Sequence, residues 1–472
     1  MNNMIADSRT TRARQIVADF HSASSVPGVS VAVFDSAHII FGQSVGVRAV
    51  ERPEEAVTAD TVFRLYSLTK MITALAAARL ADAGRLGLDD LVATFFPDSA
   101  CLPAPVQEVT VRHLLSHTSG LPRGEIDLNY GSLDPAGLSQ HTLESGVNET
   151  FVASPGDIYS YSDEGFAIVG YVIERITGLP FSAAMRELVF EPLGMDRACF
   201  DPLIAMTLPI SQQHVYRPTR GLVILPRFAD SARMRPYCGA FCSTRDLCQF
   251  GMLHLGNGLA PGSMKSIISA DAIREMRTPV TSVGLDIDLS YGLGAYLGPR
   301  YGGAISYGHE GYHVGSWTKL VLCPDASLGL AWCDNRGPSD ALNEGRLRSI
   351  RELLAVFGAG EPSWAAAGPQ PGAGVDHAEA VGWFRRSAGG SLRVQESAGQ
   401  LHISDRGCDA PLVPYRGSVF VTPEHVALPD RTPWKPHSGS DRCCVCFVRG
   451  HDGSVSYLSF NGIAFRRQEG TG

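Results

Sequence analysis

The sequence has few of the signals that place a chain in a membrane, on nucleic acid or outside the cell. Its 472 residues contain no apolar run of about eighteen residues, the length that a membrane span needs. The formal net charge is -8 and no lysine- or arginine-rich cluster occurs, which argues against a nucleic-acid partner. Residues 1–14 lack the apolar stretch of a signal peptide. We therefore expect a cytoplasmic protein with no membrane or nucleic-acid partner.

Cysteine is present but is not arranged as a disulfide framework or a zinc site. The 11 cysteines are an odd number and are scattered, with one group at 238–248 and another at 443–446. Neither group has partner histidines at the spacing of a zinc site. We expect reduced thiols and no metal or cofactor. No sequence pattern specifies an oligomeric state.

Length and composition predict two domains. At 44% apolar residues the chain can form a sizeable core, and 472 residues exceed the usual size of one domain. Residues 358–375 are rich in Pro, Gly and Ala and predict a linker. Strand patterns near both ends of residues 1–357, with helices between them, predict an α+β domain. Short alternating strands in residues 376–472 predict a small antiparallel β-barrel.

One hairpin near the N-terminus contains a motif for a nucleophilic serine. Residues 26–34 and 39–47 read as two antiparallel strands, and the second includes Gly42-Gln43-Ser44-Val45-Gly46. The Gly-x-Ser-x-Gly nucleophile elbow needs a strand before the serine and a helix after it. The extended pattern simply continues here, so we do not expect Ser44 to be the nucleophile.

A second candidate serine lies at the start of a predicted helix. Residues 63–80 predict a buried helix that carries Ser67 and Lys70 near its beginning. Residues three apart share a helix face, so the amine of Lys70 could reach the hydroxyl of Ser67. A serine becomes a good nucleophile when an adjacent base takes its proton. The alternative from spacing alone is a capping serine beside a surface lysine.

A tyrosine and a carboxylate stand at the start of another predicted helix. Residues 161–163 read Tyr-Ser-Asp and precede the apolar helix expected over 167–175. If Tyr161 lies near Lys70, the neighbouring cation lowers the cost of losing the phenol proton. The alternative is that Tyr161 is one of several packing aromatic residues in this stretch.

Two histidines four residues apart invite a metal interpretation. His113 and His117 lack the adjacent glutamate and the third ligand of a helical zinc motif. We expect both to hold a loop, and we expect the polar stretch 123–149 to form part of a binding cleft.

Three motifs in one order carry a family resemblance: Ser67-Leu68-Thr69-Lys70, Tyr161-Ser162-Asp163 and His309-Glu310-Gly311. Over residues 10–356 the chain resembles the serine β-lactamase and penicillin-binding-protein superfamily, and within it the class C β-lactamase-like hydrolases. The C-terminal part resembles the lipocalin-like domain of D-stereospecific aminopeptidases and penicillin-binding-protein-type thioesterases. The resemblance implies a β-lactamase-like antiparallel sheet with a helical cluster, followed by a small all-β barrel.

The resemblance also implies roles for individual residues. Ser67 would attack a carbonyl and form an acyl-enzyme, while Lys70 and Tyr161 share the role of base. His309 would face the cleft, where it steers a carboxylate or passes a proton through Tyr161. The backbone N–H groups of Ser67 and Tyr312 would form the oxyanion hole.

Two further residues of these motifs would contact substrate. Gly311 would let substrate lie along a strand edge. Asp163 departs from the family pattern, which usually has Asn there, and a carboxylate cannot donate a hydrogen bond as an amide does. Asp163 would pair with Lys70, receive a substrate ammonium, or simply fill the position.

The expected function is a serine acyl hydrolase or acyltransferase of the Ser-x-x-Lys type. Its substrates would be small or peptide-like amides and esters, with a preference for D-residues. The alternatives are a penicillin-binding-protein-type thioesterase, peptide cyclase or transacylase, in which an amine resolves the acyl-enzyme. An alternative of another class is a catalytically idle binding or regulatory protein. We do not favour true β-lactamase action, because no export signal is evident.

Overall fold

The structure is a computed structural model that describes the chain in several stretches. These are residues 2–97, 104–124, 151–225, 230–283, 289–363, 375–386, 390–405, 408–416, 418–422, 444–450, 452–460 and 462–468. The stretch predicted to form a binding cleft, residues 123–149, lies almost entirely outside these ranges.

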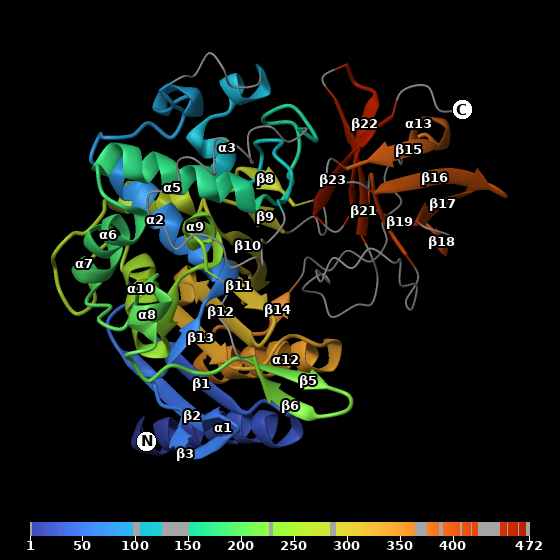
Figure 1. Cartoon of the computed structure of the whole chain (residues 1–472). Coiled ribbons are helices and arrows are strands. Elements are labelled where there is room, and N and C mark those ends of the chain that lie inside the picture. The colour runs from blue at the N-terminus through green and yellow to red at the C-terminus, as the bar shows by residue number, and fades with distance from the viewer. Residues whose placement is uncertain are drawn as a thin grey trace.

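The first part of the chain is built on one large antiparallel sheet (Figure 1). Its strands run in the order β3-β2-β1-β13-β12-β11-β10-β9-β8, and β14 pairs with β10. The N-terminal hairpin therefore lies beside β13, which confirms that both ends of this part contribute to one sheet. The strands are β1 Gly28–Phe34, β2 Ile39–Ala49, β3 Arg52–Ala56, β8 Thr281–Ser282, β9 Ser290–Tyr291, β10 Tyr296–Tyr301, β11 Ala304–His313, β12 Ser316–Cys323, β13 Leu328–Asp334 and β14 Pro362–Ser363.

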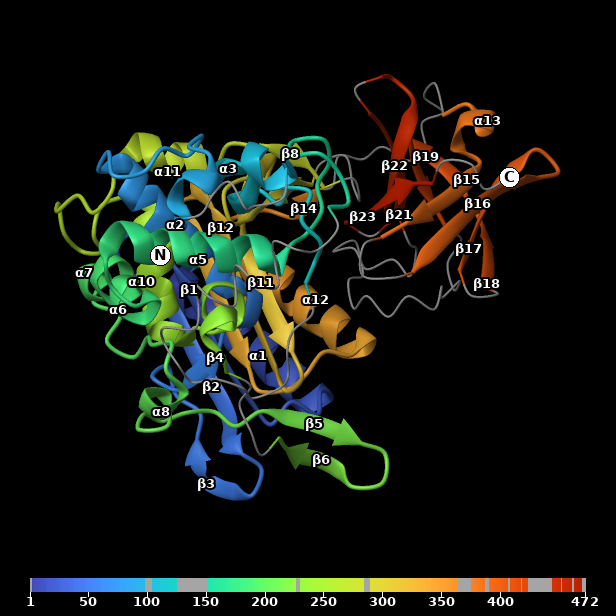
Figure 2. The same ribbon diagram turned by 45° about the horizontal axis from the view of Figure 1, so that its top comes forward.

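Helices cover both faces of this sheet. On one face α1 and α12 pack through apolar side chains such as Phe20, Leu353 and Leu354. On the other face lies a larger cluster of helices that includes α2, α5 and α10 (Figures 1 and 2). The described helices are α1 Asn2–Ala23, α2 Thr69–Asp82, α3 Val111–Leu115, α5 Asp163–Thr177, α6 Phe181–Met185, α7 Glu191–Leu193, α8 Pro202–Ala205, α9 Arg235–Cys238, α10 Thr244–Leu255, α11 Ala270–Met276, α12 Asp340–Phe357 and α13 His377–Ala380.

The predicted α+β class is confirmed, and the hairpin near the N-terminus forms as expected. Ser44 lies inside β2, and its hydroxyl meets that of Ser30 on β1 at 2.9 Å. No nucleophile-elbow turn interrupts this strand, because β2 continues in extended form to Ala49.

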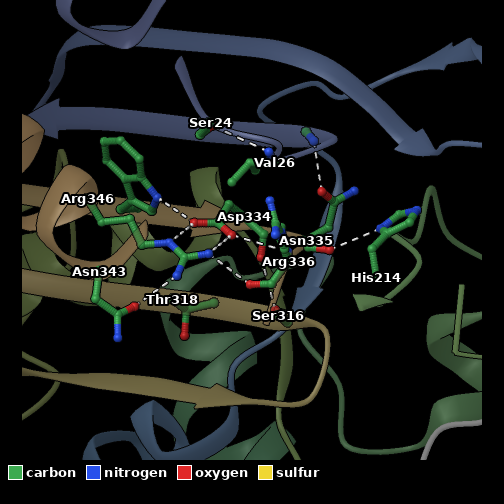
Figure 3. Close-up of polar contacts among 12 residues, drawn as sticks. Ser24, Val26, His214, Ser316, Thr318, Asp334, Asn335, Arg336, Asn343 and Arg346 are labelled. Atoms are coloured by element: carbon green, nitrogen blue, oxygen red, sulfur yellow. Dashed lines mark hydrogen bonds and ion pairs between the residues drawn. The ribbon is translucent and has the colours of Figure 1, made fainter. Parts of the chain in front are cut away.

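A buried ion pair joins the end of β13 to α12 (Figure 3). The guanidinium of Arg346 donates two hydrogen bonds to the carboxylate of Asp334, at 2.8 and 2.7 Å, and both side chains are fully buried. Trp332 Nε1 donates to the same carboxylate at 3.0 Å. Arg346 also donates to the backbone carbonyl of Arg336 at 2.8 Å. Because a bidentate pair is geometrically specific, this network fixes the point where the chain leaves β13.

The second sheet is a nearly closed antiparallel barrel in the C-terminal part of the chain. Its strands run in the order β18-β17-β16-β15-β23-β22-β21-β20-β19, and their inward side chains form a separate apolar core. The predicted all-β barrel is therefore confirmed. The strands are β15 Gly382–Arg385, β16 Ser391–Ser397, β17 Gln400–Asp405, β18 Cys408–Pro411, β19 Val413–Arg416, β20 Val419–Val421, β21 Cys444–Arg449, β22 Val455–Phe460 and β23 Ile463–Arg467.

The predicted domain boundaries at 357 and 375 stay predictions. Pro362 and Ser363 still pair with β10, so the chain remains on the first sheet for the first residues of the expected linker. Within the described stretches no single helix is long and apolar enough to cross a membrane, although α5 and residues 181–193 pass that test together as a pair bent by 79°.

A buried histidine on α10 should make the fold sensitive to acid. Burial lowers the pKa of His254 to about 3, below its ordinary 6.5. Between pH 6.5 and pH 3, His254 is therefore protonated in the unfolded chain and neutral in the folded chain. The free energy of unfolding then falls as the pH falls below 6.5. When the pH is lowered from 7 to 5, the free energy of unfolding should fall for both proteins. The fall should be about 2 kcal/mol smaller for His254→Leu than for the wild type, as measured by urea unfolding at the two pH values.

Phe250→Leu is the control for this prediction. Phe250 is buried on the same helix, with its ring centre 4.8 Å from that of His254, but it does not titrate. Its effect on stability should be the same at both pH values. Equal losses of stability for the wild type and His254→Leu would contradict the prediction.

Candidate active site

Ser67 lies in a short 3₁₀ turn, Tyr66–Leu68, that leads directly into α2. The preceding Tyr66 has φ of 47°, a left-handed conformation that bulky residues rarely adopt. Its side chain is held by two polar contacts, since its hydroxyl donates to the carbonyl of Val314 at 3.2 Å and accepts from Gln213. Such conformations cost about 1–3 kcal/mol and persist where the surroundings enforce them. The turn presents Ser67 at the start of the helix.

Lys70 is fully buried, and each of its N–H bonds has an acceptor. Nζ donates to Ser67 Oγ at 3.3 Å, to Asp163 Oδ1 at 2.5 Å and to the carbonyl of Tyr237 at 3.2 Å. Three acceptors match the three N–H bonds of a charged lysine. Burial lowers the pKa of Lys70, but the Asp163 carboxylate and Tyr161 raise it more, and the net shift is upward. Lys70 is therefore an ammonium in the resting site.

Tyr161 lies beside both residues. Lys70 Nζ lies 4.7 Å from the centre of its ring, and Tyr161 lines the same cavity as Ser67. Burial raises the pKa of Tyr161, and the nearby Lys70 ammonium lowers it by less, so the net shift is upward. Lys70 therefore lowers the pKa of Tyr161 as expected, but its effect is smaller than the opposing ones. The opposing effects, which the sequence did not reveal, are burial and the charge of Asp163, and both raise the pKa of Tyr161.

Asp163 is the first residue of α5, and the preceding residue holds it there. Ser162 caps the helix, since its hydroxyl accepts from the N–H of Gly165 at 3.1 Å. A helix N-terminus favours a carboxylate, which suits the buried Asp163. The structure thus shows the pairing of Asp163 with Lys70 that was one of three options.

The two predicted loop histidines have separate local contacts. His117 Nδ1 accepts a hydrogen bond from the N–H of Ser162 at 3.0 Å, and its ring centre lies 4.2 Å from that of Tyr161. His113 caps α3 through Nδ1, which accepts from the N–H of Thr110 at 3.2 Å. Both therefore order the backbone, and His117 does so next to the site.

His309 lies on β11 at the wall of the site as a neutral ring. Burial and the charge of Lys70 lower its pKa to about 3. Nδ1 lies 2.5 Å from the carbonyl of Glu310, so Nδ1 carries the proton and Nε2 is left as an acceptor. Among the described residues Nε2 has no hydrogen-bond partner. A neutral acceptor suits proton transfer better than the steering of a carboxylate.

Gly311 allows β11 to approach the turn that carries Ser67. A Cβ at this position would lie 1.7 Å from the carbonyl oxygen of Leu65 and 2.8 Å from the nitrogen of Leu68. The close approach is therefore to the turn, and a role for Gly311 in substrate binding stays a prediction. Tyr312 lines the same cavity as Ser67, and the oxyanion hole formed by their N–H groups also stays a prediction.

A cavity of about 590 Å³ opens above these residues. Ser67, Tyr161, Asp163 and His309 all line it, so the structure brings together residues from three separate motifs of the sequence. Such a cavity is large enough for a small-molecule or peptide-like ligand.

Three arginines also line this cavity: Arg123, the first residue of the stretch predicted to form part of a cleft, and Arg217 and Arg336, which the sequence did not single out. Among the described residues no carboxylate lies within ion-pair distance of them. Arg217 belongs to the hairpin of β5 His214–Arg217 and β6 Gly221–Ile224, visible in Figure 2. The β-branched, aromatic and aliphatic residues on either side of the Pro-Thr-Arg-Gly stretch at 218–221 were a signal that could have found the hairpin.

The arrangement has the parts that acyl transfer through a serine requires. A hydroxyl stands at a helix start, next to a cation and a phenol that can exchange protons with it. The phenol of Tyr161 lines the cavity and the cation of Lys70 is fully buried beside it, where electrostatic effects are strong.

Comparison with known proteins agrees with this geometry. A model of the family described as Beta-lactamase matches residues 13–355, well over half of the chain. The chain belongs to the Beta-lactamase family. The resemblance based on three motifs is thereby confirmed, and the family is one of serine hydrolases that share this fold.

Individual relatives extend the match along the chain. Penicillin-binding protein 4 of Amycolatopsis lactamdurans is 29% identical over 381 residues, which cover 77% of this chain and 94% of the relative. A crystal structure of SurE superposes with a TM-score of 0.77 at 24% identity, covering 99% of this chain and 100% of that one. EstCE1, described as a hydrolase with promiscuous acyltransferase activity, superposes with a TM-score of 0.60 at 20% identity, covering 75% and 99%. The SurE match includes the C-terminal barrel.

Proposed function

We propose that the protein is a serine acyl hydrolase or acyltransferase that forms an acyl-enzyme on Ser67. The observation that carries the proposal is the contact of Ser67 Oγ with the Lys70 ammonium, beside Tyr161, where Ser67 and Tyr161 line one cavity. Substrates are peptide-like amides or esters, with a preference for D-residues. The family membership and the relatives' names support this reaction class.

Proton transfer explains the roles of Lys70 and Tyr161. Both pKa values are raised, so both residues hold a proton at neutral pH. The pair must lose one proton before it can accept the proton of Ser67. Ser67 Oγ then attacks the substrate carbonyl, its proton passes to the pair, and the pair returns a proton to the leaving group. The N–H groups of Ser67 and Tyr312 hold the negative oxygen that forms.

The charge of the cavity supports a preference for anionic substrates. The pairs Lys70–Asp163 and Lys319–Glu310 are each neutral overall, whereas the three arginines of the cavity add positive charge. Arginine binds carboxylates through two parallel hydrogen bonds. The test panel below therefore includes substrates with and without a free carboxylate.

The alternative is a thioesterase, peptide cyclase or transacylase, in which an amine instead of water resolves the acyl-enzyme. EstCE1 supports this alternative through the acyltransferase activity in its description. A catalytically idle binding protein is the alternative of another class, and the intact cluster of Ser67, Lys70 and Tyr161 speaks against it.

The test measures labelling of Ser67 and then turnover. A fluorophosphonate probe should label the wild type and not Ser67→Ala, as intact-mass measurement would show. Ser44→Ala is the matched control, because Ser44 is the serine of the other nucleophile motif but lies within β2. It should be labelled like the wild type. Failure to label the wild type, or equal labelling of Ser67→Ala, would contradict the proposal that the protein is a serine enzyme.

Substrate class is tested with D- and L-aminoacyl esters that either carry or lack a free carboxylate. Each ester is measured in the presence and in the absence of an amine acceptor. Faster acylation by D-esters would support the D-residue preference. Transfer to the amine in preference to water would favour the peptide cyclase or transacylase alternative. A stoichiometric acyl adduct without turnover under any condition would favour the binding alternative.

A further inference from the structure

The outer wall of the C-terminal barrel packs against the segment that carries Tyr161. In Figures 1 and 2, strands β21–β23 lie on the side of the barrel that faces β8–β10 and the start of α5. Side chains of this wall belong to two apolar clusters that they share with residues of the first sheet and of the 152–161 segment. They are Val421, Cys444, Val448, Tyr457 and Ala464.

These strands carry apolar side chains on both faces. Alternate residues of a strand point to opposite faces, and the neighbours Phe420, Val445 and Leu458 lie in the separate core of the barrel. A strand that is apolar on both sides needs cover on both sides. The contact with the catalytic part is therefore a built interface.

The backbone of the Tyr161 segment is held from two sides. The N–H groups of Ser160 and Ser162 donate to the carbonyl and to Nδ1 of His117, at 2.8 and 3.0 Å. The N–H of Tyr161, between them, donates to the carbonyl of Gly462 in the barrel at 3.3 Å. Successive N–H groups thus point to opposite sides, as they do in an extended strand. The barrel supplies the hydrogen-bond acceptor on one of these two sides.

Side chains add to this contact. The hydroxyl of Tyr457 on β22 donates to Asp157 Oδ2 at 2.8 Å, within the segment that leads to Tyr161. Val421 on β20 packs in the cluster of Tyr159, Tyr291 and Tyr296, against which Tyr161 is partly buried. The barrel thus supports the tyrosine segment through both its backbone and its side chains.

We infer that the C-terminal barrel is a positioning element of the active site, which holds Tyr161 at the correct distance from Ser67 and Lys70. This inference rests on the proposed role of Tyr161. Among the described barrel residues none lines the cavity, so the barrel should affect the rate of acylation and leave substrate affinity unchanged. Small errors in the position of a catalytic group cost large factors in rate.

The test compares the same substitution at two sites in the full chain. Val421→Ala removes a contact behind the tyrosine segment, and Val394→Ala removes a buried valine of the barrel's own core. Val421→Ala should slow fluorophosphonate labelling about 5- to 50-fold and lower kcat with KM within about twofold. Val394→Ala should stay within about twofold of the wild type in both.

Two further variants keep the outcome clear. Tyr457→Phe retains the ring and removes the hydroxyl that donates to Asp157, and it should slow labelling about 3- to 10-fold. Wild-type rates for both Val421→Ala and Tyr457→Phe would overturn the inference. Tyr161→Phe distinguishes this failure from failure of the proposed function. If Tyr161→Phe is labelled slowly while both barrel variants are labelled at the wild-type rate, only the inference about the barrel is wrong. If Tyr161→Phe is labelled at the wild-type rate, the proposed role of Tyr161 is wrong as well.

Discussion

Replacing Lys70 by methionine should slow acylation of Ser67 by about 10²- to 10⁴-fold, the usual contribution of a positioned proton-transfer group. Methionine retains much of the length of the side chain and removes the three N–H donors that now reach Ser67, Asp163 and Tyr237. The rate of fluorophosphonate labelling, followed by intact mass, measures the loss.

The same substitution should also destabilise the fold, which needs a control. It leaves the Asp163 carboxylate buried without its partner, and breaking such a pair costs about 3–5 kcal/mol. The double variant Lys70→Met/Asp163→Leu removes both charges and should recover most of that stability. Its labelling should stay as slow as that of the single variant. Recovery of labelling in the double variant would show that the single variant fails only through folding.

The sequence was sufficient for the groups that occur in short motifs. Ser67 and Lys70 are about one helical turn apart, so their contact follows from local geometry. The order of the three motifs then identified the family, and with it the fold and the approach of Tyr161 and His309 to the same cavity.

The electrostatic state of the site did not follow from the motifs. The pKa of Tyr161 depends on how deeply its ring is buried and on the charge of Asp163, which only the packed structure supplies. Arg217 and Arg336 were missed for a similar reason, since they lie on elements that meet only through the tertiary fold. The interface on the barrel did leave a sequence signal, because β21 has apolar residues on both faces over Cys444–Val448.

Replacing Asp163 by asparagine should move the pH dependence of acylation to lower pH by about 1–3 units. The Asp163 carboxylate raises the pKa of Lys70 and also that of Tyr161. Without its charge both protons are held less tightly, so the pair reaches its proton-accepting form at lower pH. Acylation rises with pH through the apparent pKa of the pair, and that rise should begin earlier in the variant. The pH profile of kcat/KM for one ester measures the shift.

The pH profile and the substrate preference of this variant together distinguish three roles for Asp163. If the carboxylate serves the Lys70–Tyr161 pair, the profile moves and the relative rates on free-amine and N-acylated substrates stay as in the wild type. If Asp163 instead receives a substrate ammonium, the variant loses its preference for free amines while the profile stays in place. An unmoved profile with unchanged preference would mean that Asp163 only fills the position. The distance of 2.5 Å between Lys70 Nζ and Asp163 Oδ1 favours the first outcome, because a carboxylate already bound to the buried ammonium is poorly placed to bind a second cation.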